Sequence, residues 1–266
     1  MRRWLTAFNG ILWREFLRFL RQRGRFLAAL VRPLVWLFIF AAGLRSVLGV
    51  SIQPPYVTYI LYQVYIAPGL CGMILLFSGM QGSLSMVYDR EMGSMRVLLV
   101  SPWPRWFLLG SRLVGISLVA CVQVYAFLLV ARLYEVDPPW LGYLTVFPAL
   151  LLGGLMLSGL GLLLSSLVRQ LENFAGVMNF VIFPMFFASS ALYPLWRLQE
   201  SSVLLHRISS YNPFTHVVEL IRFALYLQVE WTSLGVVAVW TVLLLLAAAW
   251  GYDPRHGFLA ATRKGD

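Results

Sequence analysis

The sequence predicts an all-α integral membrane protein with six transmembrane helices, an N-terminal interfacial amphipathic helix, and short re-entrant helices before the last span. Three observations predict this class. Of the 266 residues, 60% are hydrophobic and only 12% are charged, whereas a soluble domain has about 45–50% apolar and about 25% charged residues. The apolar residues form charge-free windows long enough to cross a bilayer. The arginines gather between these windows. A soluble enzyme, a disordered linker and a disulfide-stapled secreted module are therefore excluded.

The interfacial helix is expected over residues 1–29. Arg14, Arg18, Arg21 and Arg25 recur at helical spacing on one face. Another face is apolar and carries Leu5, Phe8, Leu12, Phe16 and Phe19. A helix with one basic and one apolar face lies in the headgroup region of a membrane.

Six windows satisfy the requirement of about 20 mostly apolar residues for a span. Residues 46–88 carry no formal charge, and Pro54-Pro55 divides this stretch because a helix does not continue through paired prolines. The predicted spans are about 30–50, 57–87, 107–131, 139–168, 173–196 and 231–252. Together they make 1–266 a single transmembrane domain. Arg45, at the end of the first span, either reaches the headgroups or contacts a substrate or partner.

The placement of basic residues predicts the orientation. The segment before the first span, the connections after the second and fourth spans, and the C-terminal tail hold 16 of the 21 basic residues, against four in the opposite connections. Because cytoplasmic loops are enriched in Lys and Arg, both termini are expected in the cytoplasm. The protein is thus predicted to be a multi-pass protein of the cytoplasmic (inner) membrane.

Two connections are longer than a turn requires. The cytoplasmic loop 88–105 mixes charged and apolar residues, and its composition fits equally a helix that docks on another protein and a solvated loop. The extracytoplasmic segment 197–230 is too charged to span and too apolar for open water. We expect re-entrant helices there, one around 201–209 and one that starts with Asn212 as cap and Pro213 as its first residue and ends at about Leu227.

Small residues in the fourth span have the spacing of helix packing positions. Gly154 and Ser158, and Gly161 and Ser165, are each four residues apart. Such pairs let helix backbones approach closely. Either the chain packs its own helices there, which we consider the better explanation, or two chains meet.

Chemistry within the membrane has no visible basis in this sequence. A Walker A loop needs lysine, and the only lysine is Lys264 in the tail. The three histidines, His206, His216 and His256, lie outside the spans. We therefore expect no catalytic residues, no metal site and no cofactor in this chain. Since the basic residues lie between apolar windows, they indicate a lipid bilayer as partner and no nucleic acid.

The sequence resembles the type 2 ABC transporter permeases, the membrane subunits of exporters for polysaccharides, lipo-oligosaccharides and drugs. In that family an acidic residue, Gly, Ser or Thr, a basic residue, a Leu pair and a Pro precede the third span. The matching residues here are Glu91, Gly93, Ser94, Arg96, Leu98, Leu99 and Pro102. Asn212-Pro213-Phe214 resembles the family's motif before the last span.

The resemblance implies an ATP-driven exporter in which the loop 88–105 contains a coupling helix. That helix would dock on a separate ATPase subunit, which would bind ATP and Mg. The partner-coupling candidates are Asp89, Arg90, Glu91, Gly93, Ser94, Arg96 and Pro102.

The resemblance also implies that two copies of the chain pair and that the substrate passes between them. The polar candidates for that pathway are Tyr62, Gln63, Gln81 and Asn179. Hydrogen bonding between helices explains the same four residues without a substrate, and we prefer that explanation.

Two other functions remain open. One is a membrane assembly or maturation factor, for which the sequence offers no catalytic groups. The other is an ion-driven secondary carrier, which would show internal repeats and charges within its spans. The sequence shows no internal repeat, and Arg45 is the only charge clearly within a predicted span.

Overall fold

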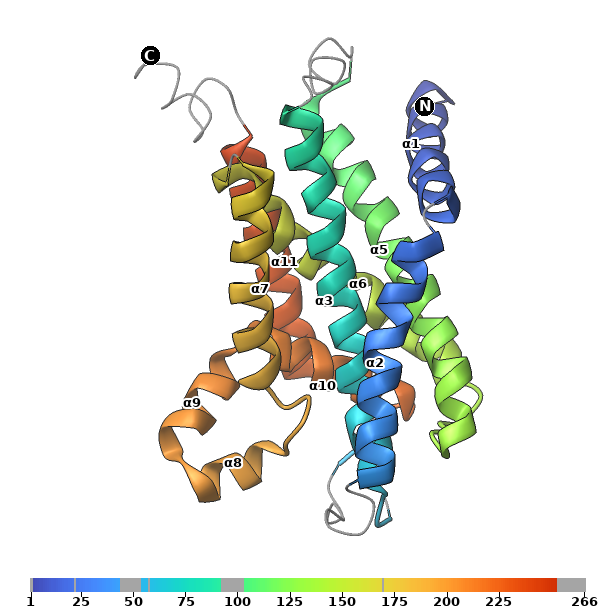
Figure 1. Ribbon diagram of the computed structural model, residues 1–266, viewed down its shortest axis with the longest axis vertical. Helices are drawn as coiled ribbons and strands as arrows, with labels where there is room; N and C mark the ends of the chain where they lie inside the picture. Colours follow the sequence, from blue (N-terminus) through green and yellow to red (C-terminus); the bar gives the residue numbers. More distant parts are fainter. Residues whose placement is uncertain are drawn as a thin grey trace.

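A single long helix, α3 (Tyr62–Glu91), occupies the centre of the bundle in the computed structural model (Figure 1). It contacts α2, α5, α6, α7 and α10. Its sequence explains this position because apolar residues occur on all sides of the helix, which is the pattern of a helix surrounded by others. Pro68 lies within its first two turns.

The structure describes residues 2–21, 23–43, 54–56, 58–91, 103–168 and 170–252. In these residues every long element is helical, in agreement with the predicted class. Besides α3, the helices are α1 (Arg2–Arg21), α2 (Arg23–Gly43), α5 (Arg105–Ala131), α6 (Gly142–Leu167), α7 (Leu171–Phe187), α8 (Leu195–Ser201), α9 (Val203–Tyr211), α10 (Pro213–Leu225) and α11 (Trp231–Gly251), with a 3-10 turn at Arg132–Tyr134.

Four of the described helices are long and apolar enough to cross a membrane: Tyr62–Asp89, Trp106–Tyr134, Gly142–Leu167 and Trp231–Gly251. Two shorter apolar helical stretches, Leu27–Ile39 and Leu171–Phe187, overlap the predicted first and fifth spans in part. The chain is therefore an integral membrane protein with several helical spans, and the number six stays a prediction.

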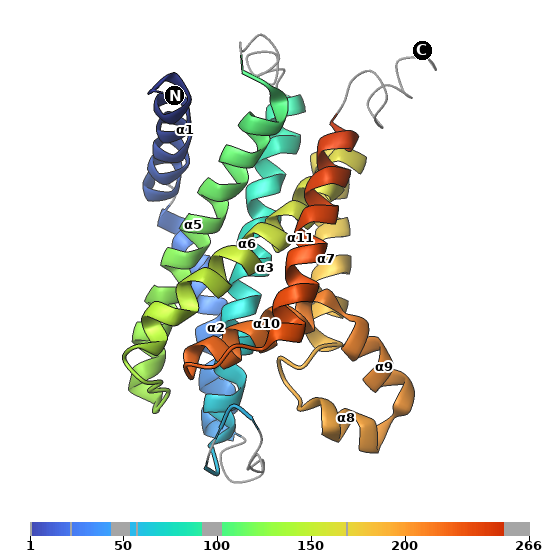
Figure 2. The ribbon, with the colours of Figure 1, turned by 180° about the vertical axis from the view of Figure 1, so that it is seen from behind.

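The two ends of the bundle differ in what they contain (Figures 1 and 2). One end, here called the α1 end, holds the first residue of α1, the end of α3 and the start of α5. It also holds the start of α7 and the end of α11. The opposite end, here called the α10 end, holds α8, α9 and α10. The described helix ends that flank the predicted cytoplasmic connections thus lie at the same end of the bundle.

The segment 197–230 forms three short helices, and α10 runs across the bundle axis (Figure 2). The predicted cap is confirmed, because the Asn212 side chain accepts a hydrogen bond from the Phe214 backbone N–H at 3.0 Å and Pro213 is the first helical residue. The helix ends at Leu225, slightly before the predicted end, and Leu227 adopts a positive φ of 61°.

The helix α7 ends at Phe187, well before the predicted boundary at residue 196. The Asn212 amide donates hydrogen bonds to the carbonyl groups of Met185 and Ala188, at 2.8 and 2.6 Å. Carbonyl groups at the end of a helix lack partners in the helix itself. Asn212 therefore supports the end of one helix and the start of another, which joins α7 to α10.

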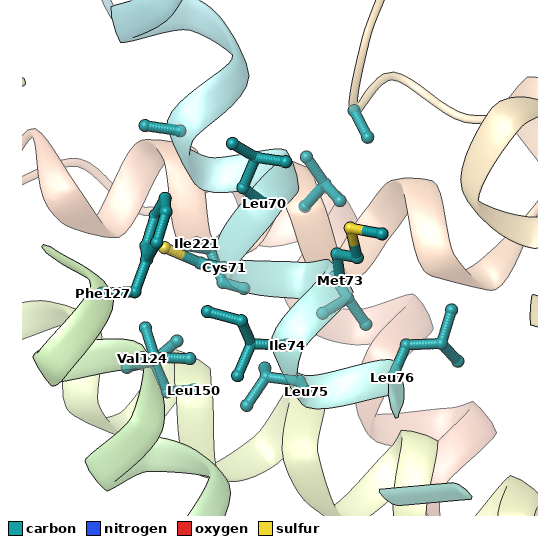
Figure 3. Close-up of a cluster of buried hydrophobic side chains, with 14 of the residues drawn as sticks. Leu70, Cys71, Met73, Ile74, Leu75, Leu76, Val124, Phe127, Leu150 and Ile221 are labelled. Atoms are coloured by element: carbon teal, nitrogen blue, oxygen red, sulfur yellow. The ribbon is translucent and has the colours of Figure 1, made fainter. Parts of the chain in front are cut away.

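The main core lies where α3 meets α5, α6 and α10 (Figure 3). Cys71 and Ile74 of α3 lie beside Phe127 and Val124 of α5, whereas Leu75 lies near Gly153 of α6.

The small residues of α6 pack within the chain, as preferred from the sequence. A side chain at Gly161 would meet Ser83 Oγ at 2.6 Å, and one at Gly154 would meet Ser117 Cβ at 3.1 Å. These glycines therefore allow α6 to lie directly against α3 and α5.

Candidate functional site

Four charged side chains from three helices meet at the α1 end. Arg112 of α5 donates to Asp89 of α3, with 3.0 Å between Nη1 and Oδ2, and its Nε lies 3.7 Å from Oε1 of Glu15 in α1. Arg18 of α1 lies 3.9 Å from both carboxylates. We call Glu15, Arg18, Asp89 and Arg112 the charged cluster.

Burial explains why these charges occur together. Glu15 and Arg112 are almost completely buried, and an isolated buried charge costs several kcal/mol unless it is paired. The cluster places two carboxylates among two arginine side chains, and the attraction between opposite charges reduces the cost of burying them. Arg112 also donates a hydrogen bond to Ser85 Oγ at 2.6 Å. Gly115 permits the close approach of α1, because a side chain there would lie 3.2 Å from Glu15 Cγ.

Among the predicted partner-coupling residues, only Asp89 has a side chain that the structure describes. It faces inward to Arg112 and Arg18 rather than outward to a partner. Arg90 and Glu91 form the last residues of α3. Their side chains, and the residues Gly93, Ser94, Arg96 and Pro102, lie outside the described part of the chain.

The sequence analysis did not identify Glu15 and Arg112 as partners. One signal was present, since Glu15 is the only acidic residue in the arginine-rich first helix. A single carboxylate among several arginines in one helix indicates that this carboxylate forms an ion pair rather than facing solvent.

A small cavity of about 60 Å³, lined by both polar and apolar side chains, adjoins the charged cluster. Gln81 lines it together with Glu15 and Arg18. Ser78, which also lines it, donates a hydrogen bond to Gln123 of α5. Gln81, one of the predicted pathway residues, is thus half-buried beside the charged cluster.

The other three predicted pathway residues lie apart from Gln81. Tyr62 donates to the Leu192 carbonyl at 2.6 Å, and Gln63 donates to the Tyr134 carbonyl at 3.0 Å and to Glu135 at 3.2 Å. Both side chains are buried and engaged within the chain. Asn179 is exposed on α7, beside Phe180, which is 79% exposed.

A second network of polar groups lies at the α10 end and centres on Arg222. This side chain is 1% exposed. It pairs with Glu219 on the same helix, and its Nη2 donates to the Ser190 carbonyl at 2.9 Å. Its guanidinium lies 4.2 Å from the centre of the Tyr65 ring, and the Tyr65 hydroxyl donates to the same Ser190 carbonyl at 3.0 Å. We call Tyr65, Ser190, Glu219 and Arg222 the arginine latch.

The arginine latch is stable in its charged form. Burial has the largest single effect and lowers the pKa of Arg222, but the neighbouring groups, Glu219 first among them, together outweigh burial, so that the pKa is raised overall. A cation over an aromatic face adds further stabilisation. The latch therefore fixes α10 and the α7–α8 connection to α3. Arg222 lies within the helix predicted from Pro213 to about Leu227, but its ion pair with Glu219 was not predicted, although their spacing of three residues indicates a helical pair.

Comparison with known proteins identifies the family. The family model described as "ABC-2 type transporter" matches residues 6–226, which is most of the chain. The chain belongs to this family. The resemblance inferred from the sequence is thereby confirmed, and the protein is a membrane subunit of a transporter rather than an enzyme by itself.

The names of individual relatives are consistent with this family assignment. The "Putative transport permease ycf38" of Cyanophora paradoxa is 27% identical over 82% of this chain and 73% of its own length. The "Probable multidrug ABC transporter permease YbhR" of Escherichia coli K12 is 30% identical over 70% of this chain, but the match spans only half of that relative's length. The "Nodulation protein J" of Rhizobium leguminosarum bv. viciae is 24% identical over 82% of this chain and 80% of its own length.

Proposed function

We propose that this chain is the membrane-spanning permease of an ATP-driven exporter, that it works as a homodimer, and that it couples to a separate ATPase subunit. ATP and Mg would bind to that subunit. The α1 end would face the cytoplasm from the cytoplasmic (inner) membrane. The excess of basic residues in the connections at this end supports the orientation.

One observation carries the proposal: α3 connects the two polar networks of the molecule. Asp89 near its end belongs to the charged cluster, and Tyr62 and Tyr65 near its start hold the α7–α8 connection. Its 30 residues span about 45 Å. A displacement at the loop 88–105 is therefore mechanically linked to the segment that would close the exit.

The charged cluster gives the coupling loop a defined base. The helix α3 continues through Asp89 to Glu91, and the contacts of Asp89 with Arg112 and Arg18 join α1, α3 and α5 just before the loop. Binding and release of ATP would change the position of the loop, and a ligand shifts such an equilibrium only through contacts that differ between the two states. We assign those contacts to Arg90, Glu91 and Arg96.

The dimer would form through the face on which α2 and α7 flank α3 (Figure 1). Ring contacts from Trp36 to Phe186 and Phe187 join α2 to α7, and beyond its first turn the exposed side of α7 is apolar except for Asn179. Asn179 is thus available to line a pathway between two copies. Tyr62 and Gln63 are engaged in holding connections at the α10 end, which favours a structural role for them.

Co-purification tests the proposal. The tagged chain, expressed with its genomic neighbours and extracted in mild detergent, is expected to retain a P-loop ATPase in equal amount. A chain that purifies alone as a stable oligomer would contradict the exporter and favour a carrier or an assembly factor.

Glu91→Ala tests the coupling contact. We expect the variant to fold and insert normally but to lose transport while the ATPase continues to hydrolyse ATP, because the loop no longer follows its partner. Glu172→Ala is the matched control, since Glu172 is an exposed carboxylate at the same end of the bundle. Transport at the normal rate by a well-expressed Glu91→Ala variant would exclude this assignment.

A further inference from the structure

Arg32 of α2 lies at the middle depth of the bundle rather than at either end. Its guanidinium carbon is 3.8 Å from the centre of the Phe77 ring. Phe77 is close to the midpoint of the candidate span Tyr62–Asp89. Arg32 is itself in the middle of the apolar stretch Leu27–Ile39. From the sequence, Arg32 was counted with the basic residues before the first span, whereas the structure places its charge deep among apolar helices.

No carboxylate of this chain lies at the depth of Arg32. Among the described residues Arg32 makes no ion pair. The sequence has no acidic residue between Glu15 and Asp89, and the apolar helices carry acidic residues only at their ends. A second copy in the same orientation would bring the same residues at the same depths. The counter-charge for Arg32 therefore has to come from another molecule.

Arg32 belongs to the face on which α2 and α7 flank α3 (Figure 1). Its side chain is exposed, and it shares a side of α2 with Trp36, one helical turn further on. The Trp36 ring lies 6.0 Å from the ring of Phe187 in α7, which in turn stacks on Phe183 at 6.2 Å. Asn179 is one turn before Phe183 and is also exposed. Arg32 and Asn179 are thus the polar residues of a largely aromatic surface.

The surroundings of Arg32 fit an anion better than they fit lipid chains. A charge at the centre of a bilayer is costly, and charged residues within spans line pathways or water-filled cavities. The Phe77 ring holds the guanidinium in place by a cation–π contact, but it leaves the positive charge uncompensated. The planar guanidinium matches the oxygens of phosphate, sulfate and carboxylate groups. Phe183 and Phe187, each close to half exposed, offer apolar surface nearby.

We propose that Arg32 binds the anionic group of an amphiphilic substrate in the pathway between two copies, while the apolar part of the substrate lies against the rings of α7. This inference rests on the proposed permease function and names its substrate class. A neutral or cationic substrate would leave the charge of Arg32 uncompensated. A small inorganic anion would leave the aromatic surface unused. Such an amphiphile is either a membrane phospholipid or a separate molecule.

Probes with a common alkyl chain test for the anionic group. The purified full-length chain in phosphatidylcholine nanodiscs is titrated with octyl phosphate, octyl glucoside and inorganic phosphate, and empty nanodiscs correct for partition into the lipid. We expect octyl phosphate to bind at least about tenfold more tightly than either other probe, because arginine and phosphate form charge-assisted hydrogen bonds. Equal affinity for the two octyl probes, or binding of neither, would overturn the proposal.

Variants of Arg32 assign the preference to this side chain. Arg32→Gln is expected to abolish the preference for octyl phosphate, and Arg32→Lys, which keeps the charge but not the planar fork, to reduce it. Arg207→Gln, which changes an exposed arginine of α9, is the control and should bind like the parent chain. Melting temperatures without probe show whether each variant is folded, and Arg32→Lys serves if Arg32→Gln does not fold. An unchanged preference in a folded variant at position 32 would contradict the proposal.

The lipids that co-purify with the chain identify the source of the amphiphile. The parent chain and Arg32→Gln are extracted in mild detergent, and their bound lipids are compared. Phosphatidylglycerol that is retained by the parent chain and lost from the variant would assign the site to a membrane phospholipid. Equal amounts in both, with the preference for octyl phosphate intact in the parent chain, would assign it to a separate amphiphile. None of these measurements uses the ATPase partner, so the failure of this site and the failure of the exporter proposal are distinguishable.

Discussion

Arg112 and Arg222 are both buried, but they are held in different ways at opposite ends of the bundle. Arg112 pairs with carboxylates on two other helices, and of these two carboxylates Asp89, at 3.0 Å, is within hydrogen-bond distance, whereas Glu15 lies 3.7 Å away. Arg222 pairs with Glu219 on its own helix and binds a backbone carbonyl and an aromatic face. The contacts of Arg112 therefore require three separate helices to keep their positions. The main ion pair of Arg222 lies within one helix.

This difference indicates which end can move. A cluster whose members belong to different helices rearranges when those helices shift, because its longer contacts are readily exchanged. A side chain that holds a fixed backbone carbonyl loses its partner if the segment moves. We therefore expect the charged cluster to change between the states of the transporter, and the arginine latch to persist.

Arg222→Ala should have the largest effect. It leaves Glu219 unpaired and removes the hydrogen bond to Ser190, and breaking a buried ion pair in this way costs about 3–5 kcal/mol. The free energy of unfolding in detergent, measured by denaturant titration, is expected to fall by that amount. Arg197→Ala, which changes a less buried arginine of α8, is the control. A loss below about 1 kcal/mol would mean that the latch does not hold this end.

Arg112→Ala should have an intermediate effect on stability, about 1–3 kcal/mol, because Arg18 remains close to both carboxylates. We also expect this substitution to weaken the contact between α1 and α5. A disulfide engineered between these helices should form more slowly in the variant, and transport should fall more than stability does. Stability and transport that decrease together would show that Arg112 only supports the fold.

Tyr65→Phe should have the smallest effect. The ring beneath Arg222 remains, and only the hydrogen bond to Ser190 is lost, which costs about 0.5–1.5 kcal/mol. Tyr59→Phe is the matched control, because the Tyr59 side chain is exposed. If Tyr65→Phe were as damaging as Arg222→Ala, the carbonyl contact rather than the ion pair would be the centre of the latch.

The helices and their caps could be predicted from local sequence. Long charge-free windows indicate spans because the bilayer core penalises charge, and Asn212-Pro213 indicates a helix start because both residues suit the first turn. The early end of α7 could not be predicted. It depends on Asn212, which lies far along the chain from the carbonyl groups it binds.

The candidate site was less predictable for the same reason. Asp89 was selected as part of a charged loop, but its role depends on Arg112 and Arg18, which come from other helices. From the sequence alone, a charged residue at the edge of a span cannot be distinguished from a solvated loop residue, because its ion-pair partner lies on another helix. Arg222 lies within a predicted helix, but its pairing with Glu219, one helical turn away, was not predicted.

Pro68 divides α3 into two arms of unequal length. Proline removes one hydrogen bond of the helix, so bending is easiest near that point. The arm from Pro68 to Tyr62 is about 9 Å long and the arm from Pro68 to Asp89 about 31 Å. A movement of the long arm at the α1 end would be taken up partly by this bend, so that only a smaller movement would reach the contacts of Tyr62 and Tyr65. The α10 end can thus keep its hydrogen bonds while the α1 end changes shape.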